Sequence, residues 1–217
     1  WTFDADAATD IRDASPWLHD ARNGGRPRNA AWCAEYRPDP WGGKCLAFDG
    51  EDDCALIEGA IVPPDSFTVE CWICPDEGGN DRQLIFATAS GAVILSIDKG
   101  KLAVSRSVEG KWRRATAGTG VAYGRWQHVA ASFDGSALSL YHDGALVGKT
   151  EAPSGGRCGQ VSIGYNSVTE SMHYSGCVDE VRLSSQALRP DRFGPHAPHS
   201  EISAAASRAK THQKNGS

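Results

Sequence analysis

The chain has 217 residues, 27 acidic and 22 basic side chains, a formal net charge of −5 and 40% hydrophobic residues. This hydrophobic content is enough to bury a sizeable core, and the length suits one large all-β domain or two small ones. A net negative chain argues against general binding to nucleic acid, which needs a basic surface. No run approaches the roughly 20 apolar residues of a membrane span, so we expect no membrane insertion.

The stretch from Asp10 to Gly43 is polar and rich in Pro, Gly and Arg. We expect it to form an ordered surface excursion that Trp17, Trp32 and Trp41 hold against the rest of the domain. The first residue is Trp1 and not Met, so we expect a processed or excised domain of a larger protein.

Short strand-like runs then recur, separated by turns rich in Gly, Asp and Pro, as in β-sandwiches and jelly rolls. In the run from Phe67 to Cys74, one face carries Phe67, Val69, Cys71 and Ile73, and the opposite face carries polar residues and Trp72. The expected strands are Lys44–Phe48, Cys54–Glu58, Phe67–Cys74, Gln83–Thr88, Val93–Ile97, Leu102–Val108, Trp112–Ala117, Trp126–Phe133, Ala137–Tyr141, Leu146–Thr150, Val161–Gly164 and Gly176–Leu183.

The segment from Gly124 to Gly144 is the most informative part of the chain. It reads GRWQHVAASFDGSALSLYHDG, which is two alternating apolar runs that each end in Asp-Gly. Alternation with a period of two predicts strands with one buried face. Asp-Gly between such runs predicts hairpins, because both central residues of a type I′ turn need positive φ. The segment therefore predicts a β-meander within an all-β, two-sheet antiparallel sandwich.

The cysteines leave several interpretations open. Cys71 and Cys74 have CxxC spacing, but no second CxxC completes a zinc site, and on a strand the two side chains point to opposite faces. Most of the cysteines fit small buried hydrophobic residues, while one or two disulfides of undefined pairing remain an alternative. The seven cysteines are Cys33, Cys45, Cys54, Cys71, Cys74, Cys158 and Cys177.

The composition changes near residue 190. We expect the folded domain to cover residues 1–190, and residues 191–217 to form a linker or tail. Within the tail, Glu201 to Lys210 could form a short, weak helix.

The motifs, taken together and in order, resemble laminin G-like jelly-roll domains of the concanavalin A-like lectin/glucanase superfamily, which also includes pentraxins. The resemblance covers about Trp1 to Leu188 and implies two curved antiparallel sheets packed face to face. The motifs that carry it are WTFD at residues 1–4, GKCLAFDGEDD at 43–53, FTVECWI at 67–73, the meander at 124–144, Ile163-Gly164, GCVDEVR at 176–182 and Ala187-Leu188.

Hydrolases of this superfamily place two or three acids on one strand in a Glu-x-Asp-x-(x)-Glu run, which the chain lacks. Asp179 and Glu180 are adjacent, so we expect them to face opposite sides of a strand. His128 lies in a motif that non-catalytic members share. We therefore expect a protein that is not an enzyme, with no catalytic residues, and a glycan-active hydrolase is the least favoured alternative.

The resemblance places ligand recognition on loops at the rim of the sandwich. The candidate ligand-binding residues lie in the loop after Gly164 and are Tyr165, Asn166, Glu170, His173 and Tyr174. Asn166 and Glu170 are oxygen donors that suit Ca²⁺, but the facing loop, Thr88 to Gly91, carries no acid, which disfavours a two-ion pentraxin-type site. Trp112 is a further aromatic candidate for sugar binding, and a turn or core role for these residues is the alternative.

Many relatives hold a structural Ca²⁺ that joins the first and last strands. The resemblance points to Asp4 and Asp179 as its carboxylate ligands, and the alternative is that Asp179 hydrogen-bonds a neighbouring loop.

The resulting hypothesis is a non-catalytic, lectin-like module that binds a glycan or a protein and belongs to a larger extracytoplasmic protein, whether secreted, periplasmic or cell-surface. A purely structural or assembly domain without a small ligand is the alternative. The oligomeric state is left open.

Overall fold

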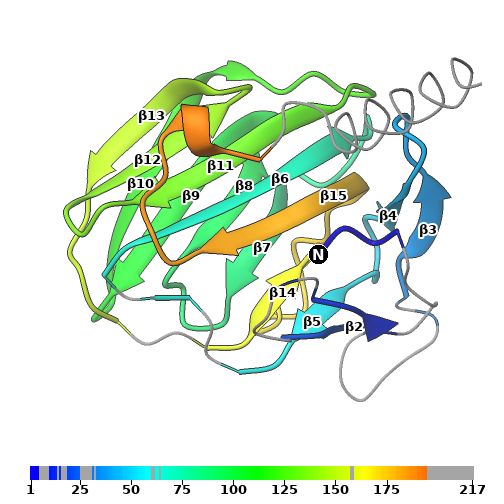
Figure 1. Ribbon diagram of the computed structural model, residues 1–217, viewed down its shortest axis with the longest axis horizontal. Coiled ribbons are helices and arrows are strands. Elements are labelled where there is room, and N and C mark those ends of the chain that lie inside the picture. Colours follow the sequence, from blue (N-terminus) through cyan, green and yellow to red (C-terminus); the bar gives the residue numbers. More distant parts are fainter. Residues whose placement is uncertain are drawn as a thin grey trace, which may run out of the picture.

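The structure is a computed structural model that describes residues 1–4, 10–13, 15, 19–24, 31, 33–59, 62–63, 65–156 and 159–194. As expected, the fold is all-β, and two antiparallel sheets of eight and seven strands form a sandwich (Figure 1). Among the residues described, no helix has the length and hydrophobicity needed to cross a bilayer.

The eight-stranded sheet has the strand order β1-β2-β5-β14-β7-β8-β9-β10. Neighbouring strands pair antiparallel throughout, with a register shift inside β7 between Leu84 and Phe86. The bounds are β1 Asp10–Ile11, β2 Ala21–Asn23, β5 Ala55–Ile57, β14 Val161–Ile163, β7 Arg82–Thr88, β8 Ile94–Asp98, β9 Lys101–Val108 and β10 Lys111–Gly120.

The seven-stranded sheet has the order β13-β12-β11-β6-β15-β4-β3, so β15, the last strand among the described residues, lies between two early ones. Its register shifts between Asp179 and Arg182, and Glu180 within this bulge has φ +50°. A bulge of this kind redirects neighbouring side chains. The bounds are β13 Ala145–Glu151, β12 Ala137–His142, β11 Gln127–Phe133, β6 Phe67–Pro75, β15 Ser175–Ser184, β4 Lys44–Asp49 and β3 Glu35–Pro38.

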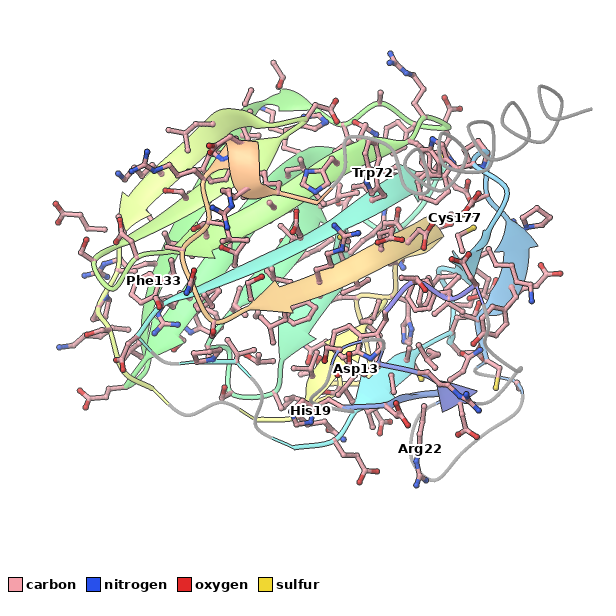
Figure 2. The ribbon with its side chains drawn as sticks, viewed as in Figure 1. Asp13, His19, Arg22, Trp72, Phe133 and Cys177 are labelled. Carbon is pink, nitrogen blue, oxygen red and sulfur yellow. The ribbon has the colours of Figure 1, made fainter. Side chains whose placement is uncertain are left out.

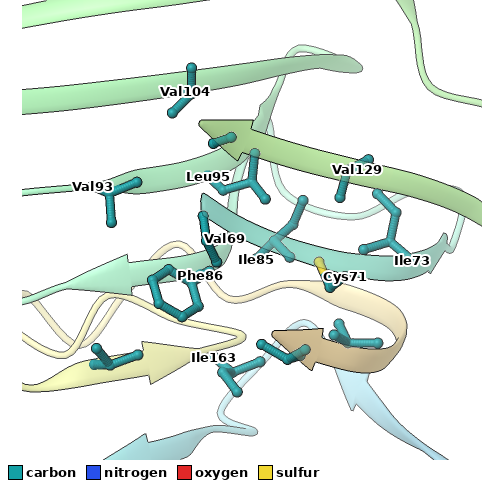
Figure 3. Packing of buried hydrophobic residues seen from close by; sticks show 14 of the residues in the cluster. Val69, Cys71, Ile73, Ile85, Phe86, Val93, Leu95, Val104, Val129 and Ile163 are labelled. Carbon is teal, nitrogen blue, oxygen red and sulfur yellow. The ribbon is translucent and has the colours of Figure 1, made fainter. Parts of the chain in front are cut away.

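The core fills the space between the sheets with apolar side chains of both (Figure 3). Phe67, Val69, Cys71 and Ile73 of β6 are all at most 1% exposed and belong to this core, which confirms the alternation predicted for that strand. Cys74 lies outside the core cluster, as expected from its opposite parity.

The β11–β12–β13 meander is present, but its two Asp-Gly turns differ. Asp143 and Gly144 both have positive φ, +48° and +76°, which fits the predicted type I′ turn. At the first turn only Gly135 has positive φ, and the strands resume pairing at Phe133 and Leu138. There the Asp134 carboxylate instead accepts the backbone N–H groups of Ser136 and Ala137 at 2.9 and 2.7 Å.

The excursion from Asp10 to Gly43 is more regular than expected, because it supplies the edge strands β1 and β3 and, next to β1, the strand β2. Trp41 packs against Trp72 and Trp126 with ring centroids 5.3 and 5.2 Å away. Between β1 and β2, Asp13 accepts the backbone N–H of His19 at 2.9 Å (Figure 2). Trp17 and Trp32 lie outside the described residues.

After β15, residues 185–194 form a strap across the outer face of the seven-stranded sheet (Figure 1). The strap contains a 3₁₀ turn at Pro190–Arg192, and the Leu188 N–H donates to the Thr68 hydroxyl at 2.8 Å. Phe193 packs on His128 of β11 and Tyr141 of β12 at 5.6 and 5.1 Å. The helix expected from Glu201 to Lys210 falls outside the described residues.

Candidate functional site

The rim loop, residues 165–174, joins β14 to β15 as a tight hairpin. Asn166 and Ser171 form a β-bridge, and Asn166 Oδ1 accepts the N–H groups of Val168 and Thr169 at 3.0 and 3.3 Å. Glu170 and Met172 complete the turn with φ of +48° and +60°. Asn166 thus stabilises the turn through its side-chain oxygen, which was the alternative to a role in ligand binding.

Two tyrosine rings of the rim loop are buried in the domain and do not lie on the loop surface. Tyr165 is 8% exposed and stacks on His173 with centroids 5.8 Å apart. Tyr174 is fully buried against Phe48, and its hydroxyl donates to the Cys177 carbonyl at 3.3 Å. The sequence placed Tyr174 among the ligand-binding residues, but this burial leaves its ring no open surface.

The outer face of the eight-stranded sheet offers a more open surface beside the rim loop. We call it face A, and it is formed by Leu84, Ala87, Ile94, Ser96, Ser105, Trp112 and Arg114. Leu84, Ala87 and Ile94 form an apolar cluster on which Met172 of the rim loop packs. Because face A crosses the four adjacent strands from β7 to β10, it is about 14 Å wide.

At the β10 end of face A, Arg114 is held by a polar network. Its guanidinium donates to Asp98 at 2.6 Å, to the Ser105 hydroxyl at 3.4 Å and to the Thr116 hydroxyl at 3.3 Å. The Arg114 and Asp98 side chains are each about one-third exposed, at 32% and 30%. The network therefore fixes Arg114 in place while part of it faces solvent.

Trp112 lies two residues before Arg114 on the same face and is 54% exposed. Its ring lies over Gly91, where a Cβ atom would come within 2.8 Å of it, and Gly91 has φ +71°. Glycine is therefore required at this position both for the backbone conformation and for the indole. An exposed ring beside ordered polar groups is an arrangement that can bind a molecule with one apolar face and several hydroxyls.

A second candidate site lies where the N-terminal segment meets β15. The Trp1 nitrogen donates to the Val181 carbonyl at 2.7 Å, and the Val181 N–H donates back to the Trp1 carbonyl at 3.0 Å. Asp4 and, in the β3–β4 turn, Asp39 lie close enough to Asp179 for the charges of both to act on it.

Backbone groups hold one oxygen of each of these carboxylates. Asp4 Oδ1 accepts the Lys44 N–H at 2.9 Å, and Asp179 Oδ1 accepts the Glu180 N–H at 2.7 Å. Asp39 Oδ1 accepts two N–H groups of its own turn, the shorter at 2.7 Å. These bonds fix the three carboxylates in place.

The chemistry of Asp179 fits a cation. Its side chain is 0% exposed, and its Oδ2 atom has no hydrogen-bond partner among the described residues. Burial, together with the charges of Glu180, Asp39 and Asp4, raises the pKa of Asp179 to about 9. A buried carboxylate oxygen without a partner is costly, and an ion such as Ca²⁺ would satisfy it. Asp39 is thus a third candidate ligand beside Asp4 and Asp179, the two carboxylates predicted from the sequence.

A third acidic group lies in the turn after β4. Asp49, Asp52 and Asp53 each offer an oxygen within 4.8 Å of the others. The carboxylates of Asp49 and Asp53 accept N–H groups of the same turn, so they stabilise the turn without a bound ion. Burial raises the pKa of Asp53 to about 6. The turn adjoins the rim loop through Asn80, which donates to the Gly50 and His173 carbonyls.

The outer face of the seven-stranded sheet, unlike face A, is covered in part by the strap of residues 185–194. Glu70 of β6 is 3% exposed, contacts His128 at 3.0 Å and accepts the Gly194 N–H of the strap. His128 is therefore buried between Glu70 and Phe193 of the strap.

A family model described as the concanavalin A-like lectin/glucanases superfamily matches residues 49–192, which is more than half of the chain. The chain belongs to this superfamily. The two-sheet sandwich is thus a jelly roll of the concanavalin A-like type, as the sequence motifs indicated. A search of the curated proteins finds no match.

Solved structures share this concanavalin A-like fold at low sequence identity. Domain 4 of AbnA, a GH43 extracellular arabinanase from Geobacillus stearothermophilus, matches with a TM-score of 0.68 and 18% identity over 87% of this chain and 97% of that one. A heptameric SAP-like pentraxin from Limulus polyphemus matches with a TM-score of 0.54 and 20% identity over 66% of this chain and 76% of that one.

The ligand-binding domain of Botulinum neurotoxin serotype D matches with a TM-score of 0.58 and 13% identity over 84% of this chain. The chain spans about half of that toxin domain, at 48% of its length. At these identities the three likenesses concern the fold alone.

Two parts of these sites were not found from the sequence. Asp39 gave no signal, because only the fold brings it to Asp4 and Asp179. The Arg114 network could have been suspected, since Trp112, Arg114 and Thr116 alternate along one strand and so share a face.

Proposed function

We propose that this protein is a non-catalytic, lectin-type module that binds carbohydrate on face A. The observation that carries the proposal is the exposed indole of Trp112 next to the ordered Arg114–Asp98–Ser105 network. A sugar ring has an apolar face that packs on an indole, and its hydroxyls pair with fixed donors and acceptors. Arg114 and Asp98 supply both kinds of group.

The rim loop forms the other border of the proposed site. Val168 is 64% exposed and Glu170 is also exposed, while Met172 holds the loop on the apolar part of face A. The loop can therefore contact a ligand that extends along the face. Asn166, Tyr165 and His173 act indirectly in this proposal, because they hold the loop in shape.

The known structures support a carbohydrate ligand and an extracytoplasmic place of action. The arabinanase domain was solved in complex with arabinotriose, and that enzyme is extracellular. The toxin domain was solved in complex with N-acetylneuraminic acid. We infer the same class of ligand here.

The proposal of a non-catalytic role rests on the burial and pairing of the carboxylates Glu70 and Asp98. Glycoside hydrolysis needs two carboxylates that face the sugar from about 5 to 9 Å apart. Glu70 is covered by the strap, and Asp98 is paired with Arg114. Neither of them is presented as a free catalytic acid.

We also propose a structural Ca²⁺ among Asp4, Asp39 and Asp179. When bound, the ion would neutralise this buried acidic group and tie the N-terminal segment and the β3–β4 turn to the last strand. The unpartnered Asp179 Oδ2 atom is the observation that favours it.

The test of the carbohydrate proposal is a glycan array of neutral and acidic oligosaccharides, followed by calorimetric titration of the best binder. We expect Trp112→Ala to weaken binding at least tenfold, and Glu170→Ala to weaken it less. Tyr123→Ala is the matched control, because Tyr123 is also an exposed aromatic, at 39%, but lies in the β10–β11 loop.

An array without any binder would overturn the proposal and favour the assembly alternative. Equal affinities of the parent and Trp112→Ala proteins would place the site elsewhere than face A.

A further inference from the structure

Three cysteines lie together on the outer face of the seven-stranded sheet, away from face A. They are Cys45 on β4, Cys74 on β6 and Cys177 on β15, of which Figure 2 labels Cys177. Their chain neighbours Leu46, Val178 and Ile73 all point into the core, so the three thiols point outward. The three strands are adjacent in the sheet, in the order β6-β15-β4.

Cys177 is the central member of this thiol cluster. It pairs directly with Cys74 across β6 and β15 and with Ala47 across β15 and β4. Cys45 is two residues from Ala47, so it is a diagonal neighbour of Cys177. Diagonal positions are wider than opposite ones. Each of the two thiols shifts the pKa of the other through a side-chain hydrogen bond, which raises the pKa of Cys45 and lowers that of Cys177, as expected for sulfurs that lie close together.

The two thiols differ in access. Cys45 is 0% exposed and donates to the Arg37 carbonyl at 3.5 Å, whereas Cys177 is partly exposed. Arg37 pairs with Cys45 in the register of β3 and β4, and its charge acts on Cys177. An accessible thiol near a guanidinium, with a buried thiol behind it, is suited to thiol–disulfide exchange.

We propose that Cys177 and Cys45 form a reversible disulfide that joins β15 to β4. The Cys177 thiolate attacks a sulfur of a small disulfide such as oxidised glutathione, forms a mixed disulfide and releases one thiol. The Cys45 thiolate then attacks the Cys177 sulfur and releases the second thiol. Two protons pass to the released thiolates, so the protein is oxidised by two electrons and the small disulfide is reduced.

This bond would close a loop from residue 45 to residue 177, which contains most of both sheets. A disulfide that closes a loop of about 100 residues or more strongly restricts the unfolded chain. We expect the oxidised protein to melt on the order of 10 °C above the reduced protein. The cluster would then make the stability of the module depend on the redox state of its surroundings.

The test uses the full chain, incubated with either oxidised or reduced glutathione, quenched with acid, alkylated in denaturant so that the buried Cys45 is also reached, and mapped by mass spectrometry. We expect a linked Cys45–Cys177 peptide and a raised melting temperature only after oxidation. Cys45→Ser and Cys177→Ser should abolish the rise. Cys74→Ser should keep it, and Cys71→Ser, which removes a core thiol, is a second control.

Complete alkylation of Cys45 and Cys177 after oxidation would overturn the proposal. A linked Cys74–Cys177 peptide in its place would also overturn it, because the pairing would then follow the strand register and not the thiol contact. The peptide map of the unmutated chain decides between these outcomes even where a serine variant does not fold.

Discussion

The His128 imidazole lies 3.0 Å from the Glu70 carboxylate, and both side chains are under 10% exposed. The pair joins β11 to β6 at the centre of the seven-stranded sheet, and the Gly194 N–H of the strap donates to the same carboxylate. Phe193 covers the imidazole. Glu70 is therefore the point at which the strap is held to the sheet.

We expect Glu70→Ala to lower the free energy of unfolding by about 3 kcal/mol, because it leaves buried donors without their acceptor. Chemical denaturation measures this loss. Glu35→Ala is the control, since Glu35 pairs with Arg37 at 2.9 Å but is 68% exposed, and an exposed pair contributes about 0.2–1 kcal/mol. Similar losses for both variants would contradict a structural role for the buried pair.

Calcium should stabilise the protein through the site at Asp4, Asp39 and Asp179. At a free Ca²⁺ concentration 100-fold above Kd, the gain is about 2.7 kcal/mol relative to chelator-treated protein. Asp179→Asn should abolish this gain in thermal melts, and Asp81→Asn, which changes an exposed acid, should keep it. Identical melting curves with calcium and with chelator would exclude the ion.

The Asp53 carboxyl predicts a pH dependence of stability. Its pKa is raised to about 6, above the value of about 3.9 in an unfolded chain, so the native state binds the proton more tightly. Stability from this group is therefore present below about pH 4 and is lost as the pH rises through 6, by about 2 to 3 kcal/mol. Denaturation of chelator-treated protein from pH 4 to 7 measures this slope.

Asp53→Asn should reduce that slope, because the amide does not ionise and its oxygen can still accept the Asp49 N–H. The slope that remains comes from Asp179, whose pKa is raised to about 9. An unchanged slope in this variant would assign the pH dependence to another group.

Arg106 is a buried cation that binds backbone carbonyls. Its guanidinium donates to Pro153, Ala92 and Gly155 at 3.1, 2.9 and 2.7 Å and lies 4.2 Å from the Phe133 ring centre. Arg106→Lys should cost about 2 to 4 kcal/mol, since an ammonium cannot reproduce this fork. The exposed variant Arg113→Lys should change stability by less than about 0.5 kcal/mol.

The sequence predicted the strands well because most of them alternate strictly. The run from Phe67 to Ile73 shows this, with every second side chain in the core. It predicted the strands β1 to β3 poorly, because they are short and partly polar. Their pairing depends on distant partners that local patterns do not encode.

The candidate sites were harder to predict because they too combine residues that are distant in the sequence. The Asp4–Asp179 relationship came from the family resemblance and not from spacing, and Asp39 joins it only through the fold. Tyr174 was expected on the loop surface, but it lies one residue before β15, where the side chain already points into the core.

The position of β15 has a consequence for how the chain acquires its structure. This last strand pairs with β6 on one side and β4 on the other, so both earlier strands keep an open edge until residues 175–184 are made. Open strand edges are templates for pairing with other chains. Because such long-range pairing is slow, we expect folding on the millisecond to second scale. The chain is then most prone to aggregate during its own synthesis, just before β15 emerges from the ribosome.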